Sequence, residues 1–94
     1  MRTFFDINNV NGSFPRLSKV NKDCLTLSLL EHLLLDKGFD VDITTPDVRN
    51  TKQSTHDLEE RMDYCLECMF LTVPSNTRIK VYPYNNTKFA IELY

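Results

Sequence analysis

The chain has 94 residues, which is enough for one domain and leaves little room for two. With 41% hydrophobic and 26% charged residues, the composition is that of a globular domain with a modest core and excludes a disordered or fibrous chain. The formal net charge of −2 lacks the strong positive excess of a general nucleic-acid-coating protein, although it permits a local basic patch.

Three cysteines, Cys24, Cys65 and Cys68, are too few and odd in number for a disulfide framework. Residues 1–6 carry no apolar signal segment, and the longest apolar-rich stretch, Leu25 to Leu35, is too short to span a bilayer. We therefore expect a cytoplasmic protein with reduced cysteines and no membrane partner.

The N-terminal third combines a strand, a polar segment and a helix. Residues 2–7 predict a short strand. Asn11-Gly12 is typical of a type I′ hairpin and predicts an extra strand over residues 14–20, which Pro15 would confine to a sheet edge.

The first long helix is predicted from about Asp23 to Lys37, capped by Asn21 or Asp23 and ended by Gly38. Its apolar face comprises Leu27, Leu29, Leu30, Leu33 and Leu34. Leu25 and Leu35 fall outside that face. We expect Phe14, Leu17 and Val20 to cover them, or else a homo-oligomer or a partner helix to contact them.

The middle of the chain predicts a strand and a second helix. Residues 39–44 alternate strictly between apolar and polar, as a half-buried strand does. A helix is expected over residues 55–70, with Ser54 and Asp57 resembling a capping box. The apolar face of this helix comprises Leu58, Met62, Cys65, Leu66 and Met69.

Residues 78–84 and 88–94 predict a C-terminal hairpin. A three-residue loop, Tyr84-Asn85-Asn86, keeps the apolar residues of both strands on one side, sets Arg78 opposite Glu92 and places Asn86 where a positive φ is tolerated. The predicted fold is thus a single α+β domain over residues 1–94, of order β-α-β-α-β-β. One mostly antiparallel sheet carries two helices packed on one face, with room for the extra N-terminal hairpin strand.

Catalytic and metal-binding motifs are incomplete in this sequence. The Cys65-Leu66-Glu67-Cys68 motif lacks a second ligand pair for zinc and lies near the end of its helix, where the helix dipole opposes a thiolate. We expect one core and one boundary cysteine.

His56 and Glu60 lie one turn apart and could hold a metal ion together. A metal or catalytic site near His56, Cys65 and Cys68 is nevertheless the least favoured interpretation. His32 is expected to be solvated. We predict no cofactor and no enzyme activity.

Two surfaces are candidate binding sites. Glu60, Asp63 and Glu67 form an acidic stripe that a basic partner would recognise, and a solvated helix face is the alternative explanation. The face of the sheet away from the helices is expected to carry aromatic and basic side chains, namely Phe4, Arg78, Lys80, Tyr82, Tyr84, Lys88 and Tyr94. Arg2 and the carboxylates of Asp6, Asp40, Asp42 and Glu92 stand beside them.

Tyrosine and arginine are enriched at protein interfaces, and aromatic rings flanked by basic groups also stack on single-stranded bases. Ordinary strand tyrosines on a wet sheet face are the third explanation. The sequence favours a non-catalytic protein-binding module, an adaptor or a stoichiometric inhibitor, with a nucleic-acid-contacting domain as the alternative. Small asparagine-rich, glycine-poor chains are frequent among accessory proteins of phages and mobile elements, which suggests a host factor as the partner.

Overall fold

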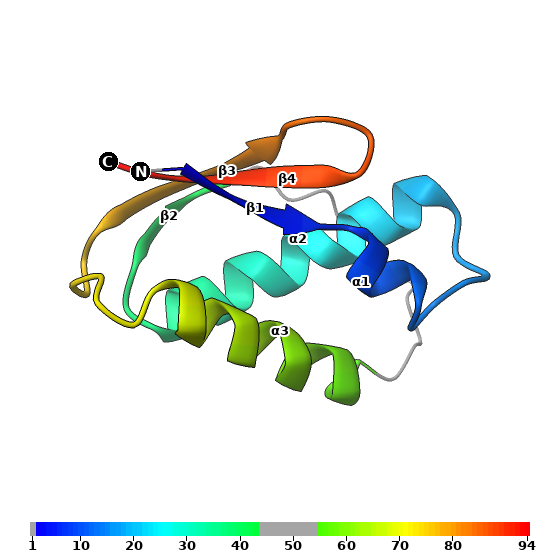
Figure 1. Ribbon diagram of the computed structural model, residues 1–94, viewed down its shortest axis with the longest axis horizontal. Helices are drawn as coiled ribbons and strands as arrows, with labels where there is room; N and C mark the ends of the chain where they lie inside the picture. The colour runs from blue at the N-terminus through cyan, green and yellow to red at the C-terminus, as the bar shows by residue number, and fades with distance from the viewer. Residues whose placement is uncertain (1, 44–54) are drawn as a thin grey trace.

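The computed structural model describes residues 2–43 and 55–94. Along the chain, the elements are β1 (Arg2–Asp6), α1 (Asn8–Asn11), α2 (Lys19–Asp36), β2 (Asp40–Asp42), α3 (His56–Met69), β3 (Arg78–Pro83) and β4 (Lys88–Leu93). The long helices α2 and α3 lie on the same side of the sheet, which leaves the other side uncovered by them (Figure 1). The predicted α+β fold class is confirmed.

The four strands form one sheet in the order β1-β4-β3-β2. β4 lies between β1 and β3 and pairs antiparallel with both, whereas β2 pairs parallel with β3. A parallel pair requires a crossover connection, and α3 lies in the connection between β2 and β3. The first and last strands are therefore neighbours, and the two ends of the chain lie close together (Figure 1).

The C-terminal hairpin forms as predicted, but its loop lies one residue further along. Tyr84 and Asn85 both donate their N–H groups to the carbonyl of Lys88, so residues 85–87 make the turn. The Asn85 side chain closes it by accepting from the Thr87 N–H at 2.9 Å. Asn86 does not adopt the positive φ that its predicted position in the loop would tolerate; among the described non-glycine residues only Asn76 has one.

This loop shifts the register of the hairpin by two residues. Lys80, not Arg78, lies opposite Glu92, so the predicted pair of Arg78 with Glu92 is wrong. Arg78 instead accepts a backbone hydrogen bond from Tyr94 at 3.0 Å. Because a shift of two preserves the side-chain alternation, the apolar residues still face the helices as predicted.

The N-terminal segment contradicts the predicted hairpin. Asn11-Gly12 ends the short helix α1, and Gly12 has a right-handed φ of −64° instead of the left-handed conformation of a type I′ turn. Asp6 accepts the Asn8 N–H at 2.8 Å, which turns the chain as soon as β1 ends. Val10 is fully buried, so packing of this turn into the core outweighs the local hairpin preference.

Helix α2 begins four residues earlier than predicted. Ser18, rather than Asn21 or Asp23, caps it by accepting the Asn21 N–H at 3.2 Å. The predicted C-terminal signal is correct, because Gly38 has a φ of +87° just after the helix. For α3, the predicted capping box begins at Ser54, which lies outside the described residues.

One core joins α2, α3, the N-terminal segment and the inner face of the sheet. Leu25, predicted to lie outside the apolar face of α2, is buried in the core against which Phe14 and Leu17 pack, whereas Leu35 is exposed and lacks the predicted cover. Val20 is exposed and does not contribute to that cover. The fully buried residues of the core are Val10, Leu30, Leu34, Leu66, Ile79 and Ile91.

Two adjacent leucines of α2 test this packing. Leu34 is 0% exposed and Leu35 is 52% exposed. We expect Leu34→Ala to lower the free energy of unfolding by about 2–5 kcal/mol, because it leaves a cavity in the core. Leu35→Ala should change it by less than about 0.5 kcal/mol. Urea denaturation followed by circular dichroism measures both. Equal losses in the two variants would contradict the orientation of α2.

Candidate functional site: the open face of the sheet

The face of the sheet that α2 and α3 leave uncovered is called here the open face. Since Ile79, Val81, Phe89 and Ile91 point into the core, the alternating residues of each strand point to the open face. They are Arg2, Phe4 and Asp6 of β1; Lys88, Ala90 and Glu92 of β4, followed by Tyr94; Arg78, Lys80 and Tyr82 of β3, followed by Tyr84; and Asp40 and Asp42 of β2.

An aromatic cluster lies at one end of the open face. The rings of Phe4 and Tyr84 are 4.6 Å apart between centroids and tilted by 58°. The Arg2 guanidinium carbon lies 5.6 Å from the Phe4 centroid and 5.4 Å from the Tyr84 centroid, and Lys88 approaches Phe4 at 6.0 Å. These distances are within cation–π range. Phe4 is 36% and Tyr84 49% exposed, so the cluster is accessible to a partner.

Tyr82 lies in the middle of the open face and is held on two sides. Its hydroxyl donates to the Glu92 carboxylate at 2.8 Å, and Lys80 lies 5.9 Å from its ring centroid. A hydrogen bond with Tyr82 also raises the pKa of Arg2 above its ordinary value. Tyr82 is half-buried.

Ala90 is the residue of this site that the sequence reasoning did not identify. It pairs with Phe4 on one side and Tyr82 on the other, and it is fully buried although it lies on the open face. Its small side chain lets the flanking rings cover it. The alternation of apolar and polar residues in β4 already places Ala90 on the open face. An alanine has no charged, aromatic or hydrogen-bonding group, so it was not considered as a site residue.

Charges on the open face alternate in sign across the strands. The register places Arg2, Glu92, Lys80 and Asp42 in one row that crosses all four strands. Over the whole face, four basic residues (Arg2, Arg78, Lys80, Lys88) face four carboxylates (Asp6, Asp40, Asp42, Glu92), so the formal charge is zero. A balanced pattern of this kind specifies the orientation of a partner more than it attracts a polyanion.

Tyr94 is separate from the aromatic cluster. It follows β4, whereas Lys88 begins it, so the two lie about 20 Å apart at about 3.3 Å per residue. Tyr94 is exposed and has Arg78 at 6.0 Å from its ring. The structure therefore brings together Phe4, Tyr82, Tyr84, Lys80 and Lys88 of the predicted site. It places Tyr94 and Arg78 at the opposite end.

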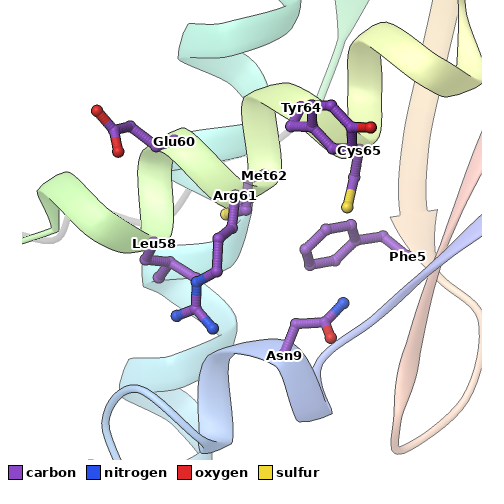
Figure 2. A pocket seen from close by; sticks show the side chains of 8 residues that line it. All are labelled: Phe5, Asn9, Leu58, Glu60, Arg61, Met62, Tyr64 and Cys65. Carbon is purple, nitrogen blue, oxygen red and sulfur yellow. The ribbon is translucent and has the colours of Figure 1, made fainter.

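A pocket of about 350 Å³ lies beneath β1, between α1 and α3 (Figure 2). Its lining residues are Phe5, Asn9, Leu58, Glu60, Arg61, Met62, Tyr64 and Cys65. Phe5, Leu58 and Met62 are buried and make its walls apolar. In Figure 2 the Cys65 sulfur points toward the Phe5 ring, and Glu60 points away from it. Arg61 at the mouth also donates to the Ser13 hydroxyl. The sequence reasoning missed this pocket because two distant segments form it.

The prediction of one core cysteine is wrong, because Cys65 and Cys68 are both exposed and Cys24 is half-buried. Cys65 lies on the apolar side of α3, but the pocket next to Phe5 leaves its thiol accessible. All three cysteines are free. Within residues 2–43 and 55–94, no group of three or more His, Cys, Asp or Glu side chains is arranged to hold a metal ion.

The histidines lie on the surface of the helices. His56 lies 3.2 Å from Glu60, as their one-turn spacing predicted, and both are largely exposed. His56 and Cys65 are separated by about 13 Å of helix at about 1.5 Å per residue, too far to share a metal ion. His32 is exposed, as expected, and lies 3.4 Å from Asp36 and 3.5 Å from Glu59.

The acidic stripe of α3 is partly neutralised within the chain. Lys37 forms an ion pair with Asp63, the middle residue of the stripe, and so joins the end of α2 to α3. Glu60 and Glu67 remain exposed. Because Asp63 is paired with Lys37 and Glu60 lies 3.2 Å from His56, the stripe is a weaker candidate for a basic partner than the open face.

The comparisons with known proteins give no further guide to this site, because no family model, no curated protein and no solved structure matches the chain. In the part of the chain that the structure describes, none of the helices combines the length and apolar character needed to cross a membrane.

Thiol reactivity tests the placement of the cysteines. We expect Cys65 and Cys68 to react rapidly with a colorimetric disulfide reagent and the half-buried Cys24 to react more slowly, because access limits thiol exchange. The Cys65→Ser variant should lose one rapid equivalent. A Cys65→Ser variant that loses no rapid equivalent would contradict the exposure of Cys65.

Proposed function

We propose that this protein is a non-catalytic protein-binding module, an adaptor or a stoichiometric inhibitor, that recognises its partner with the open face of its sheet. The observation that carries the proposal is the exposed aromatic cluster of Phe4 and Tyr84, with Arg2 stacked over both rings at 5.4–5.6 Å. Tyrosine and arginine supply a large share of the binding energy at protein interfaces.

The cluster is supported by a rigid framework. Its members come from paired strands, and Ala90 and Tyr82 connect Phe4 to the centre of the sheet. The Tyr82–Glu92 hydrogen bond holds the central ring in one orientation. Side chains that are already ordered lose little conformational entropy when a partner binds, which favours affinity.

The charge pattern supports a protein partner more than a nucleic acid. The carboxylates of Glu92 and Asp6 lie among the basic groups of the face, opposite Arg2, Lys80 and Lys88 in the register. A phosphate backbone would approach these carboxylates unfavourably, whereas a mixed-charge protein surface can pair with both signs. A host protein is the class of partner that we expect.

Differential capture from a lysate of host cells tests the proposal. We expect tagged Tyr82→Ala/Tyr84→Ala protein to lose a partner that the wild type retains, since truncating central aromatic residues costs about 2 kcal/mol or more each. Tyr64→Ala is the matched control, because Tyr64 is 69% exposed but lies on α3. The single Tyr84→Ala variant changes only the more exposed of the two positions, so it should fold even if the double variant does not. Full capture by the folded double variant would rule out this surface.

A nucleic-acid-contacting face is the second candidate, favoured by the positions of Lys80 and Lys88 over the rings of Tyr82 and Phe4. In that case Arg78, Lys80, Tyr82 and Lys88 would contact a single strand. We expect no anisotropy change with a labelled single-stranded oligonucleotide at about 50 mM salt. A change that falls steeply with salt and is lost in Lys80→Ala/Lys88→Ala would favour the nucleic-acid function instead.

A further inference from the structure

The outer side of β1 is an open strand edge. Among residues 2–43 and 55–94, β1 ends the strand order β1-β4-β3-β2, so only one of its sides is paired. Ile7 donates its N–H to Thr87 at 2.8 Å, continuing the ladder between β1 and β4. Because bonded pairs alternate in an antiparallel ladder, Thr3 and Phe5 also direct their backbone groups toward β4. Arg2, Phe4 and Asp6 direct theirs outward. Such an edge is a template for another strand.

We propose that this edge pairs with β1 of a second copy of the chain, antiparallel and about a two-fold axis at Phe4. The sequence of β1 is self-complementary in that register. Arg2 of each copy lies opposite Asp6 of the other, and the two Phe4 residues lie opposite each other. In this register, Arg2, Phe4 and Asp6 of one copy, whose backbone N–H and C=O groups point outward, lie opposite the same three residues of the other copy. An antiparallel ladder requires this match.

Other registers are less favourable. A shift of two residues in one direction places Arg2 opposite Phe4 of the second copy, and a shift in the other direction places Asp6 opposite Phe4. Each shift also shortens the overlap of the five-residue strand and unpairs both charges. The two-fold register is therefore the one in which strand length and charge agree.

Both charged groups are available for this contact. Arg2 is exposed, and its guanidinium has five donors, so the hydrogen bond with Tyr82 and the contacts with the Phe4 and Tyr84 rings leave donors to spare. Asp6 uses Oδ1 to accept the Asn8 N–H, and its Oδ2 can accept from Arg2 of the second copy.

The opposite edge of the sheet shows the contrast. β2 has only three residues, and its two ends are Asp40 and Asp42. Antiparallel pairing of two β2 strands would place these carboxylates against each other. Short strands with like charges are how sheet edges avoid self-association, and β1 lacks this protection.

A second feature at the same edge points to a second copy. The pocket beneath β1 is walled by Phe5 of that strand and by α3, and the largely exposed Tyr64 lies at its rim (Figure 2). A two-fold axis perpendicular to the sheet brings the two helix layers side by side. The second copy would thus cover apolar surface of this pocket while its strand pairs with β1.

Sedimentation velocity on the intact chain tests the proposal by charge exchange. We expect the wild type to dimerise reversibly below about 1 mM, the range of weak interfaces. Arg2→Asp and Asp6→Arg should each be monomeric, because like charges then meet. Mixed together, they should form a one-to-one heterodimer, since both cross-strand pairs become complementary again.

Arg2→Lys is the matched control, because it keeps the positive charge and should retain the dimer. The comparison of Arg2→Asp with Arg2→Lys decides the question even if Asp6→Arg, which loses the hydrogen bond to Asn8, fails to fold. A wild type that remains monomeric at about 1 mM would overturn the proposal. So would an Arg2→Asp variant that dimerises as well as the wild type, or folded charge variants that do not associate.

This inference does not rest on the proposed function. Tyr82→Ala/Tyr84→Ala protein keeps Arg2 and Asp6 and should still dimerise, whereas Arg2→Asp should lose self-association. The failure of one proposal is therefore visible separately from the failure of the other.

Discussion

The position of β4 between β1 and β3 is the constraint on which the rest of the structure depends. Antiparallel pairing on both sides fixes which residues of β4 enter the core and which do not. Phe89 and Ile91 are buried against the helices, and Lys88, Ala90 and Glu92 take the other side. The same pairing brings Phe4, near the start of the chain, next to Tyr84, near its end. Without β4 in the centre there would be no aromatic cluster.

The alternation of apolar and polar residues along the chain was sufficient to predict the elements of this fold and the faces of its sheet. The two long helices, the four strands and the side of the sheet that each side chain faces could be predicted, because burial of one face imposes a strict period. Contacts between residues far apart in the sequence could not be predicted in this way. The contact of Phe4 with Tyr84, the separation of Tyr94 and the pocket beneath β1 depend on strand order, which no local pattern encodes.

The errors have physical causes as well. Asn11-Gly12 has a strong turn preference, but burial of Val10 makes a short helix more favourable than a hairpin. The hairpin loop differs by one residue because the Asn85 side chain satisfies the Thr87 N–H, an interaction that competes with the expected turn. Cys65 is exposed although it lies on the apolar side of its helix, because the sheet ends above it and leaves a pocket. In each case a tertiary or side-chain contact outweighed a local preference.

The two proposals describe adjacent parts of one sheet. A two-fold axis perpendicular to the sheet leaves both open faces on the same side, so a dimer through β1 would present two aromatic clusters next to each other. A partner with repeated or symmetric binding sites would then gain affinity from simultaneous contact.

The nuclear Overhauser contacts of the Ala90 methyl group test the placement of β4 most directly. The account predicts contacts from this methyl to the rings of Phe4 and Tyr82, with the upfield shift that flanking aromatic rings produce. Contacts from Ala90 to the leucines of α2 or to Met62 of α3 would place it in the core, and the open face described here would then be wrong.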